Sequence, residues 1–285
     1  MIALTGATGT VGGLVTRQLS GTAPLRLLAR APDRAAHLAG EHTEVVGADL
    51  GDPAGLRRAL TGVRAALLVT ADPLTHDHDR NFLTAAREAG VRHVVKLTTL
   101  SVTEPDAVDL VTGWQRGNED LVRASGLTWT LLRPRAFMSN TLGWASSVRA
   151  EGVVRAAHGT APTAAIDPQD IAAVAAAALT APEEHAGRAY ALTGPEPVTP
   201  VEQTRVLGEL LGRPLRFVEL TEQQLRAGLL RRYPEPVAGA LLESAARSRR
   251  GTKAAVEPTV ARLLGRPGRG YRDWAAAHLP AFREA

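Results

Sequence analysis

The chain has 285 residues, and 45% of them are hydrophobic. This length and composition suit one large α/β domain, alone or with a smaller appendage. No apolar run is long enough to cross a membrane, and the absence of cysteine excludes disulfides, thiolate metal sites and cysteine nucleophiles. The net charge is +4, but the basic residues are scattered among 29 acidic ones, so we expect no nucleic-acid partner.

We expect no targeting signal at the start of the chain. Met1 is followed directly by the apolar run Ile2-Ala3-Leu4-Thr5, with no basic segment and no cleavage site. We therefore expect a cytoplasmic protein with no membrane partner. The sequence leaves open whether it is a monomer or a homodimer.

The first 135 residues alternate short apolar runs with helical patterns. The runs are rich in Val and Leu throughout, which is typical of parallel strands that are covered on both faces. Gly90 and Gly126 follow two helical segments, where a left-handed residue can end a helix. The pattern predicts an α/β fold with a doubly wound parallel sheet, the Rossmann arrangement. The expected strands are 2–5, 25–29, 44–47, 65–70, 93–98 and 128–133, and the expected helices are 11–19, 54–61, 81–89 and 118–124.

Beyond about residue 135 the pattern becomes mostly helical. Asp167-Pro168-Gln169-Asp170 begins an Ala-rich helix to about residue 180, and a strand is expected at 189–193. A helix at 199–211 and a strand at 215–220 follow. We expect residues 1–150 to form the sheet domain, with 162–196 returning to it. Residues 197–285 are expected to form a smaller part that covers a substrate.

A glycine-rich turn joins the first predicted strand to the first predicted helix. Gly6 permits a tight turn, Gly9 lets the backbone approach a pyrophosphate, and Gly12 allows close packing of helix on strand. The start of the helix offers N–H groups and a positive dipole end to phosphates. Glycines also build ordinary turns, but a strand before and a helix after indicate a dinucleotide site. Its expected members are Gly6, Thr8, Gly9, Thr10, Val11 and Gly12.

The end of the second strand distinguishes NAD(H) from NADP(H). Folds that bind NAD usually place an acidic residue there, whereas this chain has Arg30, with Arg34 one turn later. A guanidinium pairs with a 2′-phosphate and stacks on adenine, which favours NADP(H); an exposed loop arginine is the alternative. Position at the carboxyl ends of strands adds further expected cofactor contacts, namely Asp49, Leu50, Val69, Thr70 and Ala71.

With these residues in place, the chain resembles the NmrA-like branch of the atypical short-chain dehydrogenases/reductases. The resemblance covers nearly the whole chain, and it implies an NADP(H)-binding Rossmann domain with a small C-terminal part that forms the substrate cleft. The NmrA-like branch includes NAD(P)H-dependent quinone reductases and redox-sensing regulators, and many of its actinobacterial members look like enzymes of secondary metabolism. The matching segments are Thr5-Gly6-Ala7-Thr8-Gly9-x-x-Gly12, Ala85-Ala86-x-x-Ala89-Gly90-Val91-x-His93-Val94-Val95, Ser125-Gly126-Leu127-Thr128-Trp129-Thr130-x-Leu132-Arg133-Pro134-x-x-Phe137-Met138-x-Asn140, Asp170-Ile171-Ala172 and Leu192-Thr193-Gly194-Pro195.

The usual catalytic pair of short-chain reductases is absent. Those enzymes use Tyr-x-x-x-Lys, in which the lysine lowers the pKa of the tyrosine. Relatives often carry His or Lys four residues before the glutamate that matches Glu119, where this chain has Gln115, which can donate a hydrogen bond but no proton. Arg116 is a candidate electrostatic substitute, with a solvated helix arginine as the alternative. None of the three tyrosines of this chain has a lysine four residues after it; they are Tyr190, Tyr233 and Tyr271.

Residues after the fifth and sixth strands are expected at the nicotinamide. Thr98 is an expected cofactor contact, and Thr99 is a candidate catalytic hydrogen-bond partner of a substrate carbonyl, with backbone capping as the alternative. Four residues that follow the sixth strand are expected to form a wall beside the nicotinamide or the substrate, namely Pro134, Arg135, Ala136 and Phe137. For a small apolar or aromatic substrate the expected contacts, each of which has core packing as its alternative, are Leu100, Trp114, Phe137, Met138 and Trp144.

The segment Thr75-His76-Asp77-His78-Asp79 has the composition of a metal site. No third, remote ligand is evident, so a polar helix start explains it better and we expect no metal. Its place after the fourth strand leaves His76 and His78 as candidate proton donors.

Three functions remain open on these residues. The first is an NADPH-dependent oxidoreductase that transfers hydride to a carbonyl, quinone or imine without a Tyr-x-x-x-Lys pair. The second is an NADP(H)-binding sensor without turnover, and the third is a non-redox enzyme, such as a cyclase or isomerase, on the same fold. In the first, the cofactor supplies the chemistry and the protein orients it.

Overall fold

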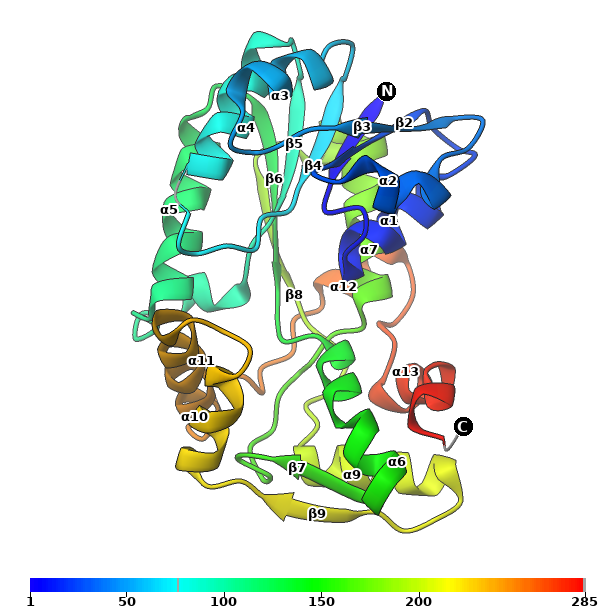
Figure 1. Cartoon of the computed structure of the whole chain (residues 1–285), viewed down its shortest axis with the longest axis vertical. Coiled ribbons are helices and arrows are strands. Elements are labelled where there is room, and N and C mark those ends of the chain that lie inside the picture. Colours follow the sequence, from blue (N-terminus) through cyan, green and yellow to red (C-terminus); the bar gives the residue numbers. More distant parts are fainter. Residues whose placement is uncertain (76, 284–285) are drawn as a thin grey trace. The chain divides into compact units, whose positions relative to one another are not determined.

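The computed structural model describes residues 1–75 and 77–283, which divide into two compact units (Figure 1). Unit 1 consists of Met1–Glu104, Thr112–Pro134 and Pro168–Ala191. Unit 2 consists of Pro105–Val111, Arg135–Asp167 and the chain from Leu192 onwards. None of the described helices combines the length and the apolar character that a membrane crossing requires.

Unit 1 is built on a seven-stranded sheet in the order β3-β2-β1-β4-β5-β6-β8. The neighbouring pairs from β3 to β6 are all parallel, which confirms the predicted doubly wound sheet. The order reverses beside β1, and a sheet of this kind binds ligands at such a reversal. The strands are β1 (Ile2–Thr5), β2 (Leu25–Ala29), β3 (Thr43–Gly47), β4 (Ala65–Leu68), β5 (His93–Leu97), β6 (Thr128–Pro134) and β8 (Arg188–Leu192).

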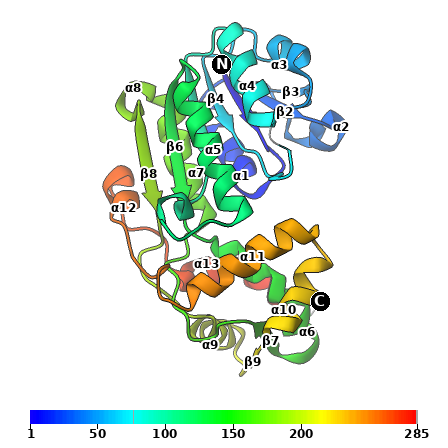
Figure 2. The same cartoon turned by 90° about the vertical axis from the view of Figure 1, so that its left-hand side faces the viewer.

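Helices cover both faces of this sheet (Figures 1 and 2). On one face Leu56, Phe82 and Val122 bring three helices onto a single buried core with the strands, and on the other face α1 and α7 pack together. The helices of unit 1 are α1 (Thr10–Leu19), α2 (Pro32–Ala35), α3 (Pro53–Ala59), α4 (Asp77–Glu88), α5 (Leu110–Ala124), α7 (Pro168–Thr180) and α8 (Pro182–His185), with 3-10 turns η1 (Ala36–Leu38) and η2 (Leu100–Thr103).

The helix predicted at 118–124 begins eight residues earlier, at Leu110. Gly113 and Gly117 weaken the local helical signal, because glycine costs about 1 kcal/mol relative to alanine inside a helix. Burial of one face, including Trp114 and Gln115, accompanies the helix through both glycines. This longer α5 carries the residues on which the catalytic predictions rest.

Unit 2 contains a small parallel pair of strands, β7 and β9, with helices around a second core. A strand was expected at 215–220, which contains β9, whereas no strand was expected at β7. The core is rich in aromatic residues, including Tyr271, Trp274 and Phe282. The elements are η3 (Met138–Trp144), α6 (Ala145–Glu151), β7 (Val153–Ala156), α9 (Pro200–Leu211), β9 (Arg216–Glu219), α10 (Glu222–Leu230), α11 (Glu235–Ser248), α12 (Thr259–Leu264), α13 (Tyr271–Ala277) and η4 (Leu279–Phe282).

Candidate functional site

A cavity of about 540 Å³ lies in unit 1 at the carboxyl ends of β1, β2 and β4. Parallel strands direct their carboxyl ends to one edge of the sheet, so residues distant in sequence gather there. The predicted cofactor residues that line this cavity are Gly6, Thr8, Arg30, Arg34, Leu50, Val69, Thr70 and Ala71.

The glycine turn has the geometry that a pyrophosphate requires. Gly6 has a φ of +65°, and a Cβ on Gly12 would lie 2.2 Å from the Gly6 carbonyl oxygen, so no other residue fits at Gly12. Gly9 caps α1 with no side chain, and the first turn, which contains Thr10 and Val11, carries no acidic residue. No capping or acidic side chain in this turn therefore occupies its N–H groups, which suits them to a bound phosphate.

Two arginines stand at the end of β2. Arg30 and Arg34 are exposed on the cavity rim, and neither forms an ion pair with any described residue. Asp49 lines an adjoining cavity of about 580 Å³ instead, with Arg30. The Asp49 carboxylate accepts a hydrogen bond of 2.7 Å from the Gly51 N–H, in its own turn. The contact of Arg30 and Arg34 with a 2′-phosphate stays a prediction, which their place on the cavity rim allows.

A fully buried ion pair supports the cavity wall after β4. The Lys96 ammonium, on β5, lies 2.5 Å from an Asp79 carboxylate oxygen and donates to the Thr70 hydroxyl at 2.6 Å. The Thr70 hydroxyl donates to the other Asp79 oxygen at 2.8 Å. Burial lowers the pKa of Lys96, and the adjacent Asp79 carboxylate opposes that shift. We call these three residues the Lys96 triad.

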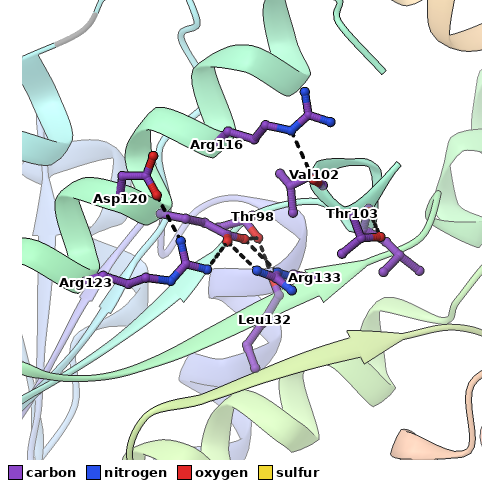
Figure 3. A network of polar contacts seen from close by, with 10 residues as sticks. Thr98, Val102, Thr103, Arg116, Asp120, Arg123, Leu132 and Arg133 are labelled. Atoms are coloured by element: carbon purple, nitrogen blue, oxygen red, sulfur yellow. Dashed lines mark hydrogen bonds and ion pairs between the residues drawn. The ribbon is translucent and has the colours of Figure 1, made fainter. Parts of the chain in front are cut away.

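A second buried carboxylate, Glu119 on α5, ties the ends of β5 and β6 together. Its partners Thr98, Arg123 and Arg133 are labelled in Figure 3. It accepts hydrogen bonds of 2.6 and 2.9 Å from Arg133, 2.7 Å from Arg123 and 2.9 Å from the Thr98 hydroxyl. Burial raises the pKa of Glu119, but the arginines and Thr98 outweigh burial and hold it below its usual value. The Thr98 hydroxyl is therefore turned into this network.

Arg116 and Thr99 both hold the loop that follows β5. The Arg116 guanidinium donates to the carbonyl oxygens of Val102, at 3.0 Å, and Glu104, at 2.6 Å. The Thr99 hydroxyl accepts from the Ser101 N–H at 3.4 Å and so caps η2. The structure thus shows Thr99 in the backbone-capping alternative. Arg116 is half-buried and holds the loop, whereas the sequence had suggested either an electrostatic catalytic role or a solvated side chain. The catalytic roles of Arg116 and Thr99 stay predictions.

The remaining predicted substrate residues fall in both units. In unit 1, Leu100 is buried, and Gln115 and Trp114 lie on the buried face of α5. Neither the Gln115 Oε1 nor the Trp114 Nε1 has a hydrogen-bond partner among the described residues. Pro134 ends β6. In unit 2, Phe137 precedes η3, and Met138 and Trp144 belong to or pack against its core.

A family model described as NAD(P)H-binding matches residues 6–182. The chain belongs to this family. It is 54% identical to the (4-alkanoyl-5-oxo-2,5-dihydrofuran-3-yl)methyl phosphate reductase of Streptomyces griseus over 99% of both chains, and 35% identical to the NAD(P)H azoreductase of Xenophilus azovorans over 100% of both. The quinone oxidoreductase 2 of Escherichia coli, solved with NADPH, has a TM-score of 0.85 at 29% identity over 98% of this chain and 99% of that one. The chain is thus an NAD(P)H-dependent oxidoreductase.

This reductase has no Tyr–Lys pair in the part of the chain that the structure describes. The Tyr190 hydroxyl lies 2.9 Å from the His185 Nδ1, and the Tyr271 hydroxyl donates to Thr141, with burial raising the pKa of Tyr271. Tyr233 is exposed. Lys96 belongs to the triad, and Lys253 donates to Ser244.

Sequence reasoning missed part of the cavity wall of this reductase. Position alone could have indicated four of the missed residues, because Ala7, Ala48 and Asp72 follow strands at the carboxyl edge and His78 lies at the start of α4; the other two lie within β2 and α3. His78 was considered only as a proton donor, and His76 lies outside the described residues. Within residues 1–75 and 77–283, no group of three acidic or histidine side chains is placed to hold a metal. The added wall residues are Ala7, Leu28, Ala48, Leu56, Asp72 and His78.

Proposed function

We propose that this chain is an NADPH-dependent reductase that saturates the ring double bond of a (4-alkanoyl-5-oxo-2,5-dihydrofuran-3-yl)methyl phosphate. The observation that carries the substrate class is the 54% identity to the Streptomyces griseus reductase along 99% of both chains. The cavity at the carboxyl edge supports the cofactor, because its glycine turn and its two unpaired arginines suit a phosphorylated dinucleotide.

The proposed step is a conjugate reduction. The ring carbon C4 of this substrate lies between the alkanoyl ketone and the lactone carbonyl, and C3 is the far end of the double bond. When bound, the reduced nicotinamide supplies a hydride, which forms a C–H bond at C3. The π electrons of the C3–C4 bond then move onto C4 and the two carbonyl oxygens as an enolate. C4 afterwards takes a proton from water, so one two-electron reduction is complete.

This chemistry suits a site without a strong general acid. Reduction of a simple ketone places the charge on one alkoxide oxygen, which must receive a proton as it forms. In the proposed substrate two carbonyl groups share the charge, so neutral hydrogen-bond donors suffice to stabilise it. Gln115 is the donor that we assign to an enolate oxygen, with Trp114 beside it on α5. Arg116 and Thr99 contribute by holding η2 in place.

The remaining cofactor assignments follow the same geometry. Arg30 and Arg34 bind the 2′-phosphate, which makes NADPH the preferred reductant. The first turn of α1 binds the pyrophosphate, and Val69, Thr70 and Ala71 line the path of the dinucleotide beyond it. Leu50 packs against the adenine end.

The function is tested with NADPH that carries deuterium at the transferred position. We expect deuterium at C3 of the product, and a second label at C4 only when the reaction runs in heavy water. The phosphate-free alcohol and an unconjugated ketone serve as control substrates, and a quinone serves as a positive control for hydride transfer. No NADPH oxidation with the phosphate, in a preparation that binds NADPH and reduces the quinone, would contradict the proposed substrate. Equal rates with the unconjugated ketone would contradict the acid-free step.

A further inference from the structure

The Lys96 triad restricts what Thr70 can bind. A threonine hydroxyl has one proton to donate and two lone pairs to accept. In this structure the proton is donated to Asp79, and one lone pair accepts from the Lys96 ammonium. A single lone pair remains, so any ligand group that binds the Thr70 hydroxyl must itself be a donor.

That requirement separates the parts of a dinucleotide. The ionised phosphates cannot donate to Thr70, whereas the ribose hydroxyls and the NH2 groups of the adenine and of the nicotinamide amide can. Strand order then chooses between the two riboses. The arginines of the 2′-phosphate lie at the end of β2, and the pyrophosphate turn lies at the end of β1. Thr70 follows β4, on the other side of β1, which is the side of the nicotinamide half.

We propose that Thr70 accepts a hydrogen bond from a hydroxyl group of the nicotinamide ribose, and that Lys96 and Asp79 are positioning residues that make Thr70 an obligate acceptor. The energetic cost of the triad supports this assignment. Replacement of a buried ion pair by apolar side chains is often neutral or stabilising, so the pair is weak evidence for stability alone. Here it lies directly behind a residue of the cofactor cavity, and its hydrogen bonds with Thr70 leave that hydroxyl one lone pair for a ligand.

The chain offers a matched control for Thr70. Thr130 is buried as well and also bridges two groups: its hydroxyl donates to the His185 carbonyl oxygen at 2.8 Å and lies 3.1 Å from the His93 Nε2. It lies on β6 beside the opposite edge of the sheet, away from the cofactor cavity. Thr70→Val and Thr130→Val therefore remove equivalent hydroxyl groups, and only one of them belongs to the proposed contact.

The experiment measures dissociation constants for NADPH and for 2′,5′-ADP, which lacks the nicotinamide ribose. We expect Thr70→Val to weaken NADPH about tenfold and to leave 2′,5′-ADP within about twofold, as the loss of one hydrogen bond implies. Thr130→Val should change neither constant, and Thr70→Ser, which keeps the hydroxyl, should bind both ligands as the native chain does. Unchanged NADPH affinity in Thr70→Val, or an equal loss for both ligands, would overturn the proposal.

A second measurement on the native chain avoids any question of folding. Two NADPH analogues are used, each lacking one hydroxyl of the nicotinamide ribose. We expect one analogue to bind about tenfold more weakly than NADPH. If both analogues bind as tightly as NADPH, the proposed contact does not exist. The charge-free pair Lys96→Met with Asp79→Leu should weaken NADPH but not 2′,5′-ADP; unchanged NADPH affinity would remove the positioning role.

Discussion

The two edges of the sheet in unit 1 each carry a cavity, and the larger one is not the proposed cofactor site. The carboxyl edge has about 540 Å³, whereas the amino edge has about 680 Å³. The first residues of four strands, Ile2, Ala65, His93 and Thr128, line the amino-edge cavity, together with residues 22–24, which follow α1, and the end of α7. Helices that end at an edge present carbonyl groups, whereas helices that begin there present N–H groups. Helix polarity therefore decides which cavity suits a dinucleotide, and volume does not.

The edges also differ in how their buried polar groups are charged. At the carboxyl edge the Lys96 triad contains an ion pair. At the amino edge His93, Thr130 and His185 form a neutral network. Burial lowers the pKa of His93 from 6.5 to about 4, with a smaller contribution from His185. Removal of the Lys96 charge should therefore destabilise the carboxyl edge, whereas protonation of His93 should destabilise the amino edge.

The largest expected effect follows from removal of the Lys96 charge. Lys96→Met leaves the Asp79 carboxylate buried without its cation, which should lower the free energy of unfolding by about 3–5 kcal/mol. The additional change Asp79→Leu should recover most of this loss. Urea unfolding of the two variants checks the result. If the single and the double variant were equally unstable, the loss would come from packing and not from an uncompensated charge.

The next effect concerns pH and the amino edge. Because the folded-state pKa of His93 lies below its unfolded value, the unfolded state binds more protons between about pH 6.5 and 4. Stability should therefore fall by about 3 kcal/mol from this residue as the pH decreases through that range. His185 and Glu183 are the ionisable groups that act on His93, and His185 also has a lowered pKa through burial.

Urea unfolding at a series of pH values measures this effect, with His93→Leu as the comparison. The pH dependence of the variant should be flatter than that of the native chain between pH 6.5 and 4. Parallel curves for the two proteins would show that His93 is not the group responsible.

A smaller effect is expected from Arg30. Arg30→Ala should weaken NADPH binding about tenfold while NADH binding stays within about twofold, since one charge-assisted contact to the 2′-phosphate is lost. Arg92 lines the amino-edge cavity and provides the matched control, so Arg92→Ala should change neither constant. Equal losses for NADPH and NADH in Arg30→Ala would show that Arg30 does not meet the 2′-phosphate.

The glycine turn and the parallel sheet could be predicted because their causes are local. Gly6 and Gly12 stand at fixed spacing between a strand and a helix, and runs of Val and Leu report burial on both faces. The strand β7 was missed because its apolar run is only Val153-Val154, whereas the equally short β9 lies in a longer apolar pattern from Leu215 to Leu220, which was predicted. The start of α5 was missed because Gly113 and Gly117 hide a helix that tertiary burial sustains.

Ion pairs and hydrogen bonds between residues of different helices and strands could not be predicted from the sequence. Lys96 was placed in a strand, but its counterion Asp79 belongs to α4, within the histidine-rich segment that was considered as a metal site. Glu119 was noticed through the resemblance, whereas its partners Arg133 and Thr98 follow only from how β5 and β6 end beside α5. Such pairs depend on the three-dimensional register of strands and helices, which residue types alone do not specify.

Hydrogen exchange of the amide groups, measured with and without NADPH, tests the comparison of the two edges most directly. We expect protection in the segments that contain Gly6–Gly12 and Val69–Asp72, and no change in the segments 22–24 and 180–186 of the amino edge. Protection at the amino edge without protection of the glycine turn would contradict it.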